Sequence, residues 1–233
     1  MPPKRKEISR TTHQDKGTLL SDAFGKLDRD ERGVISAWHP LIDHLTDVAA
    51  CFERLCKCRA IRRAMERAAR RKLTSQDIAR LAALVFLHDL GKANSGFQAK
   101  RWPRDALPRG WPAPAGHGIE ATKIFSEAFA YLTALLPIDA LCTWGDAVEP
   151  LLKASISHHG RPIIEDAADW NRAIWKRVIG TNGKAAYDPE AVLRQIGEGV
   201  VAVYPKAFEP GGEALPNAPA GIGPGFRSCT CAY

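Results

Sequence analysis

The sequence predicts an all-α protein, and three observations support this prediction. Apolar residues recur at helical spacing in several segments, and no segment reads as a convincing strand. Glycine and proline gather between these segments, where they end helices and form loops. The chain has 233 residues, 45% of them hydrophobic, which is enough for one full core and unlike a disordered composition.

In the first third of the chain, the sequence predicts a polar arm followed by the start of a folded domain. Residues 1–20 are polar and basic without periodicity, so we expect a flexible arm before a domain of residues 21–208. A short element is expected around residues 34–38. A long helix should begin near Pro40, which suits a first helical turn, and continue through a basic stretch to Lys72. That stretch leaves two interpretations open, a phosphate-binding face or an ordinary solvated face, because no aromatic residues interleave.

The next predicted helix spans Asp77 to Leu90 and brings a histidine and an aspartate to its end. Thr74 or Ser75 is its expected cap. A polar turn at residues 94–98 follows. Residues 102–116 are rich in Trp, Pro and Gly, and the prolines exclude a regular helix, so we expect a surface loop near the site.

The second half predicts four more helices and an irregular end. Expected helices lie at about residues 117–132, 146–157, 169–179 and 189–203. From residue 209 glycine and proline become frequent, so residues 209–233 should form an irregular or disordered tail that lacks a last core helix.

Charge and cysteine usage restrict the cellular setting. The formal net charge is +7, which suits a polyanionic partner such as nucleic acid but is shared by many soluble proteins. No apolar run reaches membrane-spanning length and no secretory signal is recognised, so we expect a cytoplasmic protein. The six cysteines form no paired metal-binding motif, which favours reduced thiols over a zinc site.

Histidines at the ends of predicted helices are the most informative feature. The residues concerned are His44, His88, Asp89, His117, His158 and His159. Helix ends converge in a bundle, and a buried ionised aspartate needs a strong partner. Five imidazoles with one carboxylate are too many ligands for a tetrahedral zinc, but they suit two transition metals bridged by the aspartate, a centre that hydrolyses phosphoesters. Lys92 could hold a phosphate oxygen. The alternatives are a helix-end polar pair, a core histidine at position 44 and a solvated lysine.

The order of these motifs and the local sequence around them resemble those of a known family. The order is similar to that of the HD-domain metal-dependent phosphohydrolases. Four segments resemble the HD nuclease of type I CRISPR interference, and the likeness covers roughly residues 34–219. These segments are Trp38–Leu45, Phe86–Lys92 with Phe97–Gln98, His117–Glu120 and Ser157–Arg161. A chain of this length without helicase motifs resembles the separately encoded form of that nuclease.

The resemblance implies an HD-domain helical bundle that acts as a metal-dependent endonuclease on single-stranded DNA. It implies two divalent ions, with Mn, Ni, Co or Fe favoured and Mg or Zn possible. Asp89 and Lys92 would be catalytic, and Asp89 would bridge the two ions. The first ion would be held by His44, His88 and Asp89, and the second by Asp89, His117, His158 and His159. The implied partners are a CRISPR-associated helicase subunit and a Cascade-type surveillance complex.

One departure from the family leaves two other readings open. The family has a late Asp ligand in an Ala-Asp-Trp segment, but residues 220–233 contain no carboxylate side chain, and Ala168-Asp169-Trp170 comes too early. We therefore expect a C-terminus that is shortened or shifted in reading frame, with weaker binding of the first metal. The alternatives are an HD phosphohydrolase of nucleotides, or a catalytically impaired HD scaffold that docks onto a helicase or surveillance complex.

Overall fold

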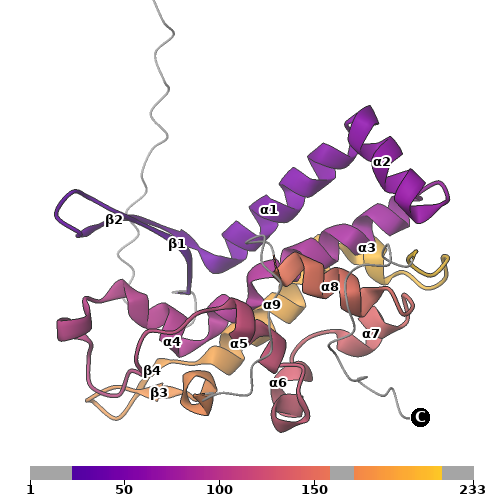
Figure 1. Cartoon of the computed structure of the whole chain (residues 1–233). Coiled ribbons are helices and arrows are strands. Elements are labelled where there is room, and N and C mark those ends of the chain that lie inside the picture. The colour runs from indigo at the N-terminus through magenta and orange to yellow at the C-terminus, as the bar shows by residue number, and fades with distance from the viewer. Residues whose placement is uncertain (1–22, 158–170, 217–233) are drawn as a thin grey trace, which may run out of the picture.

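A computed structural model describes residues 23–157 and 171–216, and Figure 1 shows that this part is mostly helical. The all-α prediction is confirmed at the level of fold class. The described residues also contain two short antiparallel hairpins, which the sequence did not predict. The first pairs β1 (Phe24–Arg29) with β2 (Ile35–Pro40), and the second pairs β3 (Val178–Ile179) with β4 (Ala185–Tyr187).

The β1–β2 hairpin accounts for the short element expected around residues 34–38. Half of its strand residues are exposed, and the strands have no apolar alternation by which the sequence could reveal them. Its base is buried at Phe24, whose backbone N–H donates to Gln98 Oε1 over 3.0 Å. The hairpin is therefore joined to the core beside the start of the next helix.

Two helices, rather than one, occupy the long helical stretch expected up to Lys72. α1 spans Leu41–Cys56 and α2 spans Arg59–Ala69. The backbone of Cys58 is extended (φ −69°, ψ 121°), and this ends the first helix and starts the second. Figure 1 shows α2 at the end of α1 that is opposite the β1–β2 hairpin.

The central helix α3 spans Ser75–Phe86 and begins as the sequence predicts. The side chain of Thr74 accepts from Asp77 N–H while the Asp77 carboxylate accepts from the Thr74 N–H, a capping box. The prediction that this helix continues to Leu90 is wrong. A tighter 3₁₀ segment, η1 (Leu87–Ala93), follows Phe86 and leads into α4 (Ser95–Gln98) and η2 (Ala99–Arg101).

Two of the later predictions are corrected and two are confirmed, one of them the helix expected at 146–157, which is α8 (Val148–Ile156). The helix expected at 117–132 is broken near Ser126, whose backbone is extended and whose Oγ donates to Lys123 O, a local bond that competes with helix. The helix expected at 169–179 is, from residue 171 on, a 3₁₀ turn and then β3. α9 (Pro189–Val203) is confirmed, with Asp188 as its cap. The remaining elements are η3 (Arg104–Ala106), α5 (Gly118–Lys123), η4 (Glu127–Phe129), α6 (Ala130–Thr133), α7 (Ile138–Cys142), η5 (Arg172–Trp175) and η6 (Pro205–Phe208).

The core is built around α3 and η1. α3 packs against α1, α8 and α9, and η1 packs against α5, α8 and α9. Phe86, Leu87 and Leu90 are fully buried there. The polar residues of η1 are thus carried into the middle of the bundle by apolar neighbours, since burial of such side chains contributes about 1.5–3 kcal/mol each.

The segment 209–216 has no regular secondary structure, as expected, yet it lies against the core. Leu215 is buried and its N–H donates to Trp144 O over 2.7 Å. The guanidinium of the buried Arg80 donates to three carbonyl oxygens of the region, those of Ala207, Gly211 and Glu213. This segment therefore closes the end of the core beneath α3.

Within the described part of the chain, no helix is long and apolar enough to cross a membrane. The four cysteines in these residues are free thiols, as the sequence favoured: Cys51, Cys56, Cys58 and Cys142.

Candidate metal centre

Asp89 lies at the centre of the site and is 1% exposed. Its backbone leaves helical geometry (φ −113°, ψ 20°) within η1, in the sparsely populated region where many active-site residues lie. His88 precedes it, and the ring Nδ1 of His88 is 2.8 Å from Val85 O, one turn back. The end of α3 thus fixes both the imidazole and the carboxylate.

Three histidines converge on the two oxygens of this carboxylate. His44 Nε2, from the first turn of α1, lies 2.9 Å from Asp89 Oδ2, and His88 Nε2 lies 3.1 Å from the same oxygen. His117 Nε2, from the residue before α5, lies 3.2 Å from Oδ1. The two oxygens therefore face different histidines, which is the arrangement that a bridging carboxylate requires.

Lys92 contributes a buried positive charge to the same cluster. Its Nζ lies 2.6 Å from Asp89 Oδ2 and donates to Gly25 O over 2.9 Å. The side chain is buried, so the alternative of a solvated lysine after the helix is wrong. An ammonium at this place compensates the charge that Asp89 would otherwise hold alone in a low-dielectric interior.

The electrostatics of Asp89 follow from two opposed effects. Burial opposes ionisation, but hydrogen bonds, those of His117 and His44 first, outweigh it and hold the pKa of Asp89 far below its usual value. The carboxyl group is therefore ionised throughout the physiological range, which is the state that binds a cation.

The residues present fit a divalent transition metal. Donor atoms of His44, His88 and Asp89 all lie within 4.8 Å of one another, and all three residues are buried. A carbonyl only accepts, so the Nδ1 of His88 carries the proton it gives to Val85, and a neutral His88 presents the lone pair of Nε2 to Asp89. Two acceptors 3.1 Å apart need a cation or a proton between them. Imidazole and carboxylate donors suit Mn, Fe, Co, Ni or Zn.

Two glycines permit the close approach that the cluster requires. A Cβ at Gly91 would overlap the carbonyl group of His117, and one at Gly25 would lie 2.5 Å from His44 Cβ. The backbone of η1 therefore touches the residue that begins α5, and β1 touches α1. Any side chain at position 91 would displace the third histidine.

Two fully buried amides, Asn94 and Gln98, hold the loops around the centre. Asn94 Nδ2 donates to Gly91 O and to Gly116 O, on either side of the contact with His117. Gln98 Nε2 donates to Lys92 O and Phe24 O. The sequence reading placed both in a polar turn and assigned them no role. The position of Asn94 before a short helix, as a cap, was the available signal.

The structure brings together five of the seven side chains that were predicted as site residues: His44, His88, Asp89, Lys92 and His117. His158 and His159 lie outside the described residues, as do Asp169 and the carboxylate-free stretch 220–233. The loop of residues 102–116 ends at the centre, where Gly116 O accepts from Asn94. The roles of all these residues as ligands stay predictions.

Comparisons with known proteins identify the family of this chain and agree with its fold. A sequence model of the family described as "Cas3, HD domain" matches residues 24–217. A solved structure, "Crystal structure of CRISPR-associated protein", is similar in fold with a TM-score of 0.54 and 20% identity. The similarity covers 86% of this chain and 21% of the other, so this chain spans about a fifth of that protein's length. No curated protein matches the sequence. The chain belongs to the Cas3 HD-domain family, which implies a metal-dependent hydrolase of CRISPR defence.

Proposed function

We propose that this protein is an endonuclease that uses divalent metal ions to hydrolyse phosphodiester bonds of single-stranded DNA. The observation that supports it best is the convergence of three imidazoles and one ammonium on the buried carboxylate of Asp89. The proposed ligands are His44, His88, Asp89, His117, His158 and His159, with Asp89 between two ions. Transition metals are favoured by the nitrogen-rich donor set.

Each residue of the cluster has a task in this proposal. Bound metal supplies an activated water and neutralises charge on the phosphoryl oxygens. Asp89 stays ionised and orients the rings of His44 and His117. Val85 O fixes the tautomer of His88, so that Nε2 faces inward. Lys92 Nζ, which contacts Asp89 here, lies where it can hold a phosphate oxygen as a point charge.

The substrate and partners are proposed from family membership and charge. A net charge of +7 suits a polyanion. We propose single-stranded DNA as the substrate. As partners we propose a CRISPR-associated helicase subunit and a surveillance complex of the Cascade type, in the cytoplasm.

A nuclease assay on the full chain tests the proposal. Labelled single-stranded DNA is incubated with protein and Mg, Mn, Co or Ni, with an EDTA control. Cleavage should require metal and be lost in Asp89→Ala, whereas Asp28→Ala, which changes an exposed carboxylate on β1, should cut normally. Intact DNA under every metal would refute the nuclease.

The amount of metal bound per chain distinguishes the proposed nuclease from a catalytically impaired HD scaffold. The proposal expects two equivalents of Mn or Ni per chain after loading and desalting, measured by mass spectrometry of the elements. A chain that retains no metal would instead support the scaffold.

A further inference from the structure

The helix α2 lies at the surface and is strongly basic. None of its side chains is buried, although Ile61 and Met65 lie half-buried against neighbouring residues. Four arginines lie on the helix and three further cations follow it directly. These cations are Arg59, Arg62, Arg63, Arg67, Arg70, Arg71 and Lys72.

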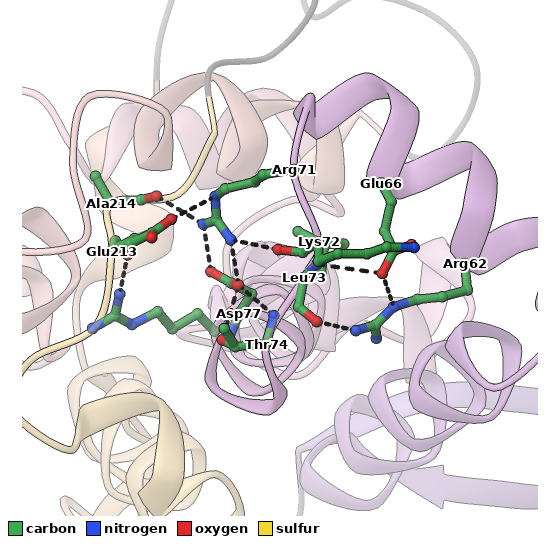
Figure 2. Close-up of polar contacts among 10 residues, drawn as sticks. Arg62, Glu66, Arg71, Lys72, Leu73, Thr74, Asp77, Glu213 and Ala214 are labelled. Carbon is green, nitrogen blue, oxygen red and sulfur yellow. Dashed lines mark hydrogen bonds and ion pairs between the residues drawn. The ribbon is translucent and has the colours of Figure 1, made fainter.

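The acidic side chains around α2 are already paired with some of these cations, as Figure 2 shows. Glu66 is bonded to Arg62 Nε over 3.1 Å and to Lys72 Nζ over 2.9 Å. These hydrogen bonds, that of Lys72 first, lower the pKa of Glu66 to about 2, so it stays charged and paired.

Arg71 is likewise paired with acidic side chains. It binds both oxygens of Asp77, at 2.6 and 2.8 Å, and its Nε lies 3.2 Å from Glu213. The junction between α2 and α3 is thereby fixed, and its acids are neutralised (Figure 2).

Three arginines are left over, and we call them the arginine face: Arg63, Arg67 and Arg70. All three are exposed, and no ion pair or hydrogen bond joins them to another side chain among residues 23–157 and 171–216. They line one shallow surface hollow together with Glu66, Arg71 and Lys72. Glu66 is the one acidic residue that lines the hollow, and its charge is paired with Arg62 and Lys72, so the hollow presents a net positive surface.

Arg70 adopts a backbone conformation that favours glycine. Its φ is +53° and its ψ is 21°, and it is the one residue other than glycine with positive φ in the described part of the chain. Glycine is the usual residue at this place after a helix, because a Cβ is disfavoured there. Arg70 therefore occupies a position at which glycine would be more stable.

The arginine face presents cations in a row that a phosphate backbone can follow. Arg63 and Arg67, at positions i and i+4, share one side of α2 and lie about 6 Å apart along its axis, and Arg70 comes directly after the helix ends at Ala69. One DNA strand carries a phosphate roughly every 3.4 Å along the duplex axis. Arginine binds phosphate through two parallel N–H groups. No aromatic side chain lies on α2, so contact with bases by stacking is not provided.

We propose that the arginine face binds the phosphate backbone of a nucleic-acid strand, without sequence preference, at a site separate from the metal centre. This inference rests on the proposed function in taking DNA as the partner, and it adds where the strand is held. His44 and Cys56 lie on the same helix, α1, about 18 Å apart at 1.5 Å per residue. Figure 1 shows α2 beyond the far end of α1. A strand bound at both places would span this distance.

Binding without cleavage tests the inference in the full chain. Fluorescence anisotropy with labelled single-stranded DNA of 20 nucleotides is measured in EDTA across a salt series. In Arg63→Gln/Arg67→Gln the affinity should fall, and the slope of log K against log salt should become shallower by about 1.4, at 0.7 per lost contact. The matched control, Arg194→Gln/Lys184→Gln, removes two exposed cations elsewhere and should keep the wild-type slope.

A second variant, Arg70→Gly, separates the loss of a DNA contact from a loss of stability. Glycine suits the positive φ, so the thermal midpoint should be equal to or above that of the wild type. The salt slope should still fall by about 0.7. A protein that is as stable as the wild type but binds DNA more weakly can only have lost a contact.

The possible outcomes separate this inference from the nuclease. Wild-type affinity and slope in both arginine variants would overturn the inference, even in a chain that cuts DNA. If DNA binding depends on the arginine face but the protein cuts no DNA under any metal, this inference stands and the proposed nuclease activity is refuted. If labelled polyglutamate, rather than DNA, shows the dependence on these arginines, the partner is an acidic protein and the inference is wrong.

Discussion

The buried carboxylate of Asp89 is stabilised by different groups in the metal-free and metal-loaded states. Without metal, Lys92 Nζ at 2.6 Å is the nearest full positive charge. In the proposed loaded state, the metal takes over this task. The relative importance of Lys92 to stability therefore depends on the metal.

This gives the first prediction, for Lys92→Met. In EDTA the variant should lose about 3–5 kcal/mol of unfolding free energy, because a buried charge loses its partner. With saturating Mn the loss should be clearly smaller. Denaturant unfolding with and without metal measures both values. Lys26→Met, an exposed change on β1, is the control, and an equal loss in both conditions would contradict the explanation.

At the same scale, the sequence predicted the charged residues of the centre but not the residues that support them. Histidine and aspartate at helix ends are informative because few other roles explain them. The sequence placed Asn94 and Gln98 in a polar turn, and it did not indicate that both are fully buried. Their bonds reach backbone groups at Gly116 and Phe24, and such distant partners leave no local signal.

At the scale of elements, η1 has to pass directly against the start of α5. Gly91→Ala would place a methyl group on the His117 carbonyl, so the two segments must separate. We expect a loss of several kcal/mol in stability and weaker metal binding, measured by unfolding and by competition with a metal indicator. Gly199→Ala on α9 is the matched control, because its Cβ meets only ordinary contacts from 3.4 Å and alanine favours helix. Normal metal binding in Gly91→Ala would contradict the geometry.

The junction between α2 and α3 has an acid-sensitive ion pair. The pKa of Glu66 is about 2 in the folded protein, below its unfolded value of about 4.3. A lowered folded pKa contributes stability above the unfolded value, and this contribution disappears as the pH falls through the folded value. The midpoint difference between wild type and Glu66→Gln should be positive at pH 6 and shrink between about pH 4.3 and 2. Glu31→Gln, an exposed turn residue, should show no such trend.

Helix starts were predictable where a cap is local, as at Thr74 and Asp188, because the donor and acceptor lie within three residues. The ends of α3 and α1 were not predicted. α3 gives way to η1 although Leu87 and Leu90 continue the apolar pattern. The extended backbone at Cys58 was likewise not predicted, because no glycine or proline stands there to indicate the end of a helix.

At the scale of the whole molecule, residues 209–216 close the core although they lack regular structure. A chain that ends at residue 208 would expose Trp144 and leave Arg80 without two of its carbonyl partners. It should be less stable than a chain that ends at residue 216 by at least about 3 kcal/mol, from Leu215 burial and the lost charged bonds. Thermal unfolding of the two truncated chains measures the difference. Equal midpoints would show that the segment contributes nothing.

The fold class was predictable because it depends on periodicity and loop composition, which are local. The packing of 209–216 was not, since glycine and proline there read as a loop and the contacts of Leu215 lie far back along the chain, at Trp144. The two hairpins were not predicted because their strands are short and lack a regular apolar alternation.

The centre joins residues that the chain supplies at widely separated times during synthesis. Asp89 meets His44, which precedes it by 45 positions, and then His117, which follows it. While residue 117 is still inside the ribosome, a nascent chain has no third imidazole to place beside that carboxylate. The proposed ligand set is therefore incomplete until residue 117 has been synthesised and packed beside Asp89.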